Sequence, residues 1–141
     1  MLTAVSSKCK GSATGVTLIE VLVTLVVVAL GLLGFAYLLN QSIVSNREAY
    51  LRTQASILAH DLAERMRANP LGARAGAYSM ADKSSASGDD PIEWVGHLED
   101  ALPEGNATVS TGVSGGALSV TIVIRWVDGG ASYSFTTQTT I

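Results

Sequence analysis

A continuous apolar run lies near the start of the chain, from Val16 to Leu39. Its 24 residues include no Lys, Arg or Asp, and its single acidic residue is Glu20. As a helix the run would span roughly 36 Å, whereas about 20 apolar residues suffice to cross a bilayer core. The pattern therefore predicts a transmembrane helix over residues 16–39. Gly31 and Gly34 inside it fit either the general frequency of glycine in membrane helices or a close contact with another helix.

A second hydrophobic pattern follows this run and has the spacing of one face of a helix. Its apolar positions are Val44, Leu51, Ala55, Leu58, Leu62 and Met66. No proline occurs between Leu39 and Pro70, and a proline disfavours helical conformation in the residue before it, here Asn69. We therefore expect one helix over residues 16–69, whose amphipathic part, residues 40–69, packs on a soluble domain.

The remaining residues, 70–141, predict that small domain. Residues 70–90 are rich in Gly, Ala, Ser and Asp, which is typical of a loop. Asp90 and Pro91 then suit the N-cap and the first turn of a short helix, with Trp94 anchored in the core. The apolar face expected for this helix consists of Ile92, Val95, Leu98, Ala101 and Leu102.

Three β-strands are predicted after the short helix, over residues 107–113, 117–127 and 132–141. Gly115-Gly116 and Asp128-Gly129-Gly130 separate them and suit tight turns, so the sheet should be an antiparallel meander. In the middle strand every second residue is large and apolar, so that one face should be buried against the long helix. These residues are Val120, Ile122, Ile124 and Trp126. The predicted fold class is α+β.

Composition narrows the possible functions. The 141 residues carry a formal net charge of −3, so the chain lacks the basic surface that nucleic-acid binding requires. Its single cysteine, Cys9, excludes an internal disulfide and a cysteine-based zinc site.

The charges beside the apolar run predict its orientation. Lys8 and Lys10 are the only charges before it, whereas Arg47 and Glu48 cancel on the other side. This asymmetry favours a cytoplasmic N-terminus and places the C-terminal domain outside the cytoplasm. Nothing like an A-x-A cleavage site follows Leu39, so the run should stay with the mature protein.

Glu20 is the unusual residue of the apolar run, because an unpaired carboxylate is costly in lipid. It could lie at the membrane boundary and reach water. Alternatively, cleavage between Gly15 and Val16 would create an amino terminus four residues away, on the same face of the helix. That cation could neutralise Glu20 within one chain or between neighbouring chains.

This segment resembles the start of type IV prepilins. A short basic leader ends in Gly15, and the sequence VTLIE, from Val16 to Glu20, opens the apolar helix. The resemblance implies that residues 1–15 are a leader, which a prepilin peptidase removes before it N-methylates Val16. It also implies that Glu20 acts in filament assembly.

A second string narrows the resemblance. LAHDLAERMRANP, residues 58–70, is similar to the helix end of minor pilins of the type IV pilus modification protein family, PilV. The family implies residence in the inner membrane with the C-terminal domain in the periplasm, and in the pilus after assembly. The partners that it implies are other minor pilins, the major pilin, the prepilin peptidase and the inner-membrane assembly platform.

Two alternatives stay open. The prepilin-like start fits a minor pseudopilin of a type II secretion system equally well. A membrane-anchored periplasmic binding domain that never assembles is an alternative of a different class.

No catalytic, cofactor or metal site is expected, so the chain should not be an enzyme. Residues 112–116 match G-x-S-x-G, but a nucleophile elbow needs a strand followed by a helix, and strands are predicted on both sides. His60 and Glu64 offer two metal ligands without an evident third, and His97 should lie on a helix surface. No phosphate-binding glycine motif occurs.

Overall fold

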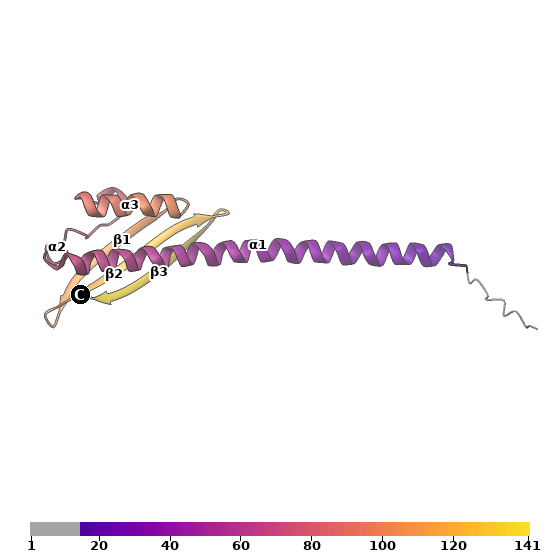
Figure 1. Ribbon diagram of the computed structural model, residues 1–141, viewed down its shortest axis with the longest axis horizontal. Helices are drawn as coiled ribbons and strands as arrows, with labels where there is room; N and C mark the ends of the chain where they lie inside the picture. The colour runs from indigo at the N-terminus through magenta and orange to yellow at the C-terminus, as the bar shows by residue number, and fades with distance from the viewer. Residues whose placement is uncertain (1–14) are drawn as a thin grey trace, which may run out of the picture. The chain divides into compact units, whose positions relative to one another are not determined.

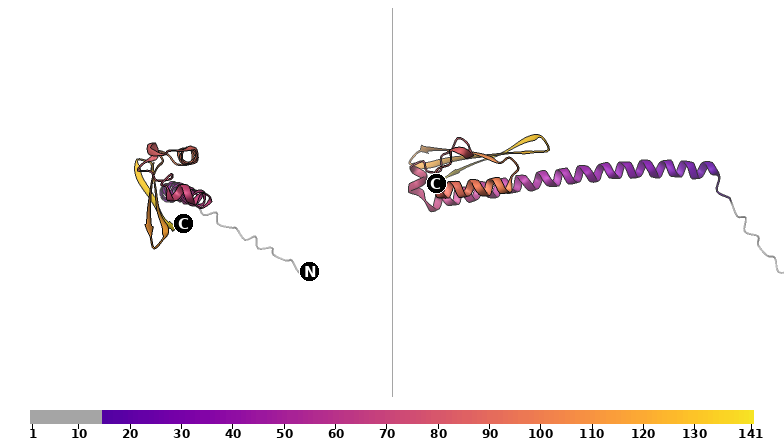
Figure 2. Two further views of the ribbon diagram at one scale, coloured as in Figure 1. Left: turned by 90° about the vertical axis from the view of Figure 1, so that its left-hand side faces the viewer. Right: turned by 90° about the horizontal axis from the view of Figure 1, so that it is seen from above.

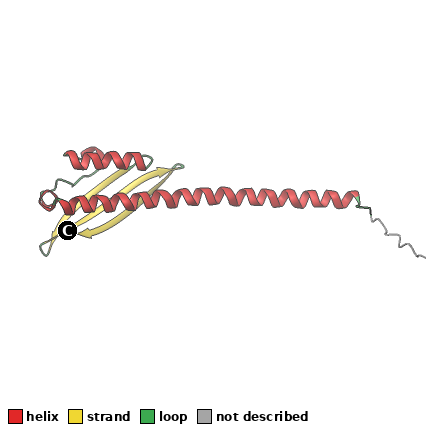
Figure 3. Cartoon of the chain, in the orientation of Figure 1, coloured by secondary structure: helices red, strands yellow, loops and turns green. Residues whose placement is uncertain are grey.

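The computed structural model describes residues 15–141, so Lys8, Cys9 and Lys10, on which the predictions of orientation and cysteine chemistry rest, lie outside the described residues. The chain forms two compact units that divide between Ser42 and Ile43. The elements, drawn in Figures 1 and 3, are α1 (Leu18–Ala68), α2 (Pro70–Arg74), a 3₁₀ turn (Lys83–Ser85), α3 (Asp89–Ala101), β1 (Asn106–Ser114), β2 (Ala117–Asp128) and β3 (Ala131–Thr140). The predicted α+β fold class is confirmed.

Helix α1 confirms the long helix, with 51 residues against the 54 expected. Asn69 ends it as predicted, but the side-chain oxygen of Asn69 then accepts the amide of Gly72 at 3.0 Å, and Pro70 opens helix α2. Further along, the Asp82 carboxylate caps the 3₁₀ turn. The predicted loop over residues 70–90 is therefore wrong in part, because these two polar side chains satisfy the backbone amides of short helical turns.

The sheet is an antiparallel meander in the order β1-β2-β3, which confirms the three predicted strands. Both turns require glycine. The φ angles are +60° and +83° at Gly115 and Gly116, and +58° and +82° at Gly129 and Gly130. Positive φ at both central positions is the geometry of a two-residue hairpin turn whose twist matches the strands.

The second half of α1 and helix α3 cover the same face of the sheet (Figure 2). As predicted, this face is formed by alternate residues of β2, each 1% exposed or less: Val120, Ile122, Ile124 and Trp126. The α1 stripe is buried from Leu51 to Met66, but Val44, expected to belong to it, is 54% exposed. Val44 lies one turn before Arg47, whose guanidinium contacts Asp128, the last residue of β2, at 2.7 Å. The buried residues of α1 therefore begin only at Leu51.

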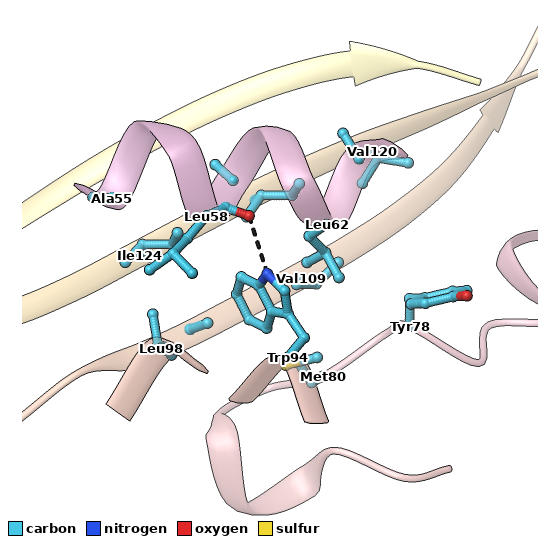
Figure 4. Packing of buried hydrophobic residues seen from close by; sticks show 14 of the residues in the cluster. Ala55, Leu58, Leu62, Tyr78, Met80, Trp94, Leu98, Val109, Val120 and Ile124 are labelled. Atoms are coloured by element: carbon cyan, nitrogen blue, oxygen red, sulfur yellow. Dashed lines mark hydrogen bonds between the residues drawn. The ribbon is translucent and has the colours of Figure 1, made fainter. Parts of the chain in front are cut away.

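Helix α3 begins at Asp89, with Gly88 as its N-cap, so the prediction that Asp90 is the N-cap is wrong. The predicted apolar face is also rotated, since Pro91, Trp94 and Leu98 are buried while Ile92 is 55% exposed. Trp94 accounts for the rotated face. Its indole is fully buried, as predicted, and donates Nε1–H to the carbonyl of Leu58 on α1 at 3.0 Å (Figure 4), which selects the face that α3 presents.

Candidate functional site at the start of helix α1

The predicted cleavage site lies outside the helix. Gly15, Val16 and Thr17 are exposed and not helical, and the first helical hydrogen bonds run from the amides of Glu20 and Val21 to the carbonyl of Thr17, at 3.0 and 3.3 Å. The peptide bond between Gly15 and Val16 is therefore free of the intrahelical hydrogen bonds that a protease would have to break.

Glu20 lies in the first turn of α1. Free amide groups and the positive end of the helix dipole stabilise a carboxylate there, by about 0.3–1 kcal/mol. The spacing Thr17-x-x-Glu20 is also the signature of a capping box, a signal available from sequence alone. Within residues 15–141, no cationic side chain lies within ion-pair distance of Glu20. The structure thus brings Gly15, Val16 and Glu20 together at one helix end and leaves the carboxylate available to a further partner.

The first half of α1 presents an exposed apolar surface. Every large hydrophobic residue from Val16 to Val44 is at least 47% exposed. By length and composition the helix can cross a membrane, and such a helix is compatible with a single-pass anchor. The helix continues through Gly31 and Gly34, and a Cβ added at either position would meet no atom within 4 Å. No contact within this unit therefore requires glycine at these two positions.

A polar cluster links the end of α1 to α3. Within the string over residues 58–70, the Arg65 guanidinium donates to Asp61 at 2.9 Å and to Asp90 at 2.5 Å, and it reaches Glu93 at 3.5 Å. The hydroxyl of Tyr78, a residue with a buried ring, donates to the second oxygen of Asp90 at 2.6 Å. The cluster joins three segments that are far apart in the sequence.

The cluster perturbs the titration of its members. The hydrogen bond from Tyr78, supported by Arg65, lowers the pKa of Asp90 below its ordinary value despite partial desolvation. Burial, together with the hydrogen bond to Asp90, raises the pKa of Tyr78. The hydrogen bond to Asp90 also raises the pKa of Arg65. These shifts favour a charged Arg65, a neutral Tyr78 and an ionised Asp90, which are the states in which the hydrogen bonds form. The cluster therefore acts as a structural clamp between the three segments.

The i, i+4 spacing of Asp61 and Arg65 predicts their ion pair, but nothing local in the sequence indicates the contacts with Asp90. Asp90 lies 25 residues from Arg65 and 12 from Tyr78, so only the fold brings them together. The role predicted for Asp90 therefore changes: its carboxylate is a partner of Arg65.

The remaining candidate residues are surface features. His60 Nε2 and Glu64 Oε1 are 3.7 Å apart on exposed side chains, and His97 is exposed on α3. Over residues 15–141 no three His, Cys, Asp or Glu side chains gather in a way that could hold a metal ion. The G-x-S-x-G match lies at the β1–β2 turn, between two strands.

No protein-family model, curated protein or solved structure matches the chain. Its fold and this site define a class of protein: an α+β protein with an apolar N-terminal helix long enough to cross a membrane, whose second half packs on a small antiparallel sheet.

Proposed function

We propose that the chain is a minor type IV pilin of the PilV kind. It is inserted in the inner membrane with its C-terminal domain in the periplasm, cleaved after Gly15 and N-methylated at Val16 by the prepilin peptidase. The mature chain is then incorporated into the pilus, or primes its assembly, together with the major pilin and other minor pilins.

The observation that carries the proposal is the exposed apolar half of α1, in which Glu20 is the single charged residue. Lipid satisfies its leucine and valine side chains as well as a neighbouring helix does, so apolar burial alone gives little reason to leave the membrane. A carboxylate is different, because its attraction to a nearby cation is strong in a low-dielectric environment. The free amino group of a cleaved Val16, on the same or a neighbouring chain, supplies that cation.

Two features of the helix start support the cleavage step. The Gly15–Val16 bond is exposed and outside the helix, and the amino terminus that cleavage would create lies one helical turn before Glu20. In the remainder of the helix, Gly31 and Gly34 leave room for a close helix neighbour.

The direct test is mass spectrometry of the chain from sheared pili and from membranes. The expected mature species lacks residues 1–15 and carries one methyl group on Val16. An intact Met1 in assembled filaments would exclude the proposal.

The role of Glu20 is tested with two matched variants. Glu20→Ala should remain in the membrane fraction but be lost from sheared pili, whereas Glu20→Asp, which keeps the carboxylate, should retain part of the incorporation. Absence of the wild-type chain from sheared pili, with unchanged function of Glu20→Ala, would favour an anchored binding domain that does not assemble. Normal incorporation of Glu20→Ala would contradict the role proposed for Glu20. Deletion of the gene then separates a pilin from a pseudopilin, since a secretion defect with normal pili would favour the latter.

A further inference from the structure

The two edges of the sheet differ in their hydrogen bonds. On the outer edge of β1, Met80 and Val109 exchange backbone hydrogen bonds of 3.0 and 2.8 Å, and the Thr108 hydroxyl donates to the carbonyl of Ala81. On the outer edge of β3, no backbone group bonds to anything outside the sheet within residues 15–141. The β1 edge is covered at Val109, whereas the β3 edge is open.

The hydrogen-bond pattern identifies the open groups. Leu118 and Ile141 exchange two backbone hydrogen bonds, so in an antiparallel pair every second residue of β3 bonds to β2 and the residues between them point their N–H and C=O outward. The outward-pointing residues are Ser132, Ser134, Thr136, Gln138 and Thr140. The same alternation, continued across β2, assigns Val109 of β1 to its outer edge, which is where Met80 bonds.

Strand β3 lacks the usual protection of an open edge. Natural edge strands avoid unwanted pairing by charged residues, proline, bulges or short length. The ten residues of β3 include no charge and no proline, and their register with β2 is continuous from Ala131 to Thr140. The strand is therefore suited to pair with another strand.

A groove of about 280 Å³ runs beside this edge, between β3 and α1. Helix α1 supplies one wall and β3 the other; the lining residues are Ser56, Ala59, His60, Ala63, Arg67, Phe135, Thr137, Gln138 and Thr139. Ala59 and Ala63 are small, buried residues of the α1 wall. Arg67 crosses one end of the groove and donates to the hydroxyl of Thr139 at 2.8 Å.

The charges of the groove compensate one another. Glu64 forms an ion pair with Arg67 and lies 3.7 Å from His60 Nε2, so neither basic side chain faces the groove without a carboxylate. A charged ligand would therefore find no opposite charge to replace its lost water. This electrostatic balance favours an uncharged occupant.

We propose that the β3 edge and this groove bind an extended, uncharged segment of another polypeptide by strand addition. The segment hydrogen-bonds to the outward groups around Thr136, and strand alternation places every second side chain over the groove. Apolar side chains fit there against Phe135 and the small alanines, while serine or threonine faces solvent at the positions between. This surface belongs to the unit from Ile43 to Ile141 and does not depend on the fate of the apolar half of α1.

The test uses the full chain in detergent micelles and a fluorescent, end-capped probe peptide of alternating threonine and leucine, seven residues long. Fluorescence anisotropy should show saturable binding. Thr136→Pro removes one outward N–H without breaking a bond to β2, and proline is tolerated at such edge positions. It should weaken binding about tenfold, whereas Thr136→Ala, which keeps the N–H, should bind like the wild type. A probe with lysine in place of leucine should bind weakly.

Three results would overturn the proposal: no binding of the probe, equal binding by a folded Thr136→Pro variant, or equal binding of the lysine probe. A wild-type dimer that Thr136→Pro dissociates, without probe binding, would identify a second copy as the occupant and overturn it as well. Ser56→Phe provides a check that leaves the edge intact. It occludes the groove from an exposed position of α1, so unchanged probe binding by this variant would also contradict the proposal.

Discussion

The two halves of helix α1 use the same kinds of residue in opposite environments. Leu33 in the first half is 69% exposed, whereas Leu62 in the second half is fully buried. Both halves are helical, so the backbone does not distinguish them. The difference is that the chain supplies a packing surface for one half only. The other half needs lipid or a neighbouring helix to remove its side chains from water.

The charges follow the same division. The second half carries ion pairs along its exposed faces, with Glu48 and Arg52 at 3.7 Å and Asp61 and Arg65 at 2.9 Å. The first half has Glu20 alone. An amphipathic helix with surface ion pairs suits water, and a helix that is apolar on all sides suits lipid or a helical bundle. One helix thus combines a half suited to an apolar environment with a half suited to water.

A matched pair of truncations tests this division with the largest expected effect. Leu62→Ala should lower the free energy of unfolding of the soluble unit by about 2–5 kcal/mol, because it leaves a cavity in a closed core. Leu25→Ala, at a position 62% exposed, should leave that free energy unchanged. Urea unfolding followed by tryptophan fluorescence reports this unit alone, since both tryptophans lie in its core. Equal losses for the two variants would contradict the division.

The two tryptophans sharpen the comparison inside the second unit. Trp94→Phe should cost about 2 kcal/mol, because it removes the buried hydrogen bond to Leu58 as well as indole volume. Trp126 is equally buried, but its Nε1–H has no partner within residues 15–141. Trp126→Phe removes that unpaired donor and keeps an aromatic ring against Tyr133, so it should cost about 1 kcal/mol or less. A larger loss for Trp126→Phe than for Trp94→Phe would contradict this assignment.

Periodic patterns predicted the elements of this chain well. The strand alternation of β2 placed Ile122 and Ile124 in the core, and the helical stripe from Leu51 to Met66 was found buried. Such patterns succeed because they depend on burial of one whole face. They failed for Ile92, because the long-range hydrogen bond from Trp94 to Leu58 selects the buried face of α3. They failed also for Val44, which lies beyond the position where Arg47 reaches Asp128 at the end of β2.

The helix start and the surfaces built by the fold also differ in how far a local sequence pattern could reveal them. Gly15, Val16 and Glu20 are neighbours in sequence, so a local motif was enough to propose them, and their roles remain predictions. The groove beside β3 and the contact of Arg65 with Asp90 join α1 to residues at least 25 positions away, and no local motif contains both partners. Only the fold brings them together.

The clamp yields a smaller expected effect. Arg65→Lys keeps the positive charge but loses the planar fork that serves Asp61 and Asp90 together, and it should cost about 1–2 kcal/mol. Arg52→Lys is the matched control on the same helix, since its ion pair with Glu48 is long and exposed, and it should cost less than about 0.5 kcal/mol. Urea unfolding measures both. A loss for Arg65→Lys no greater than that of the control would show that the clamp adds nothing beyond a surface ion pair.

The smallest effect expected is the pH dependence of that clamp. Because the pKa of Asp90 is lower in the folded chain, its ionised form favours folding above the unfolded value of about 4, and this contribution fades as the pH falls through the folded pKa. The carboxylate is 42% exposed, so solvent screening limits the contribution to about 1 kcal/mol or less. Asp90→Asn should therefore lower stability at pH 7 and flatten the loss of stability between about pH 5 and pH 2. Acid titration of the tryptophan fluorescence measures this, with Asp89→Asn, on an exposed neighbour, as the control. An unchanged acid slope in Asp90→Asn would show that other carboxylates govern the acid response.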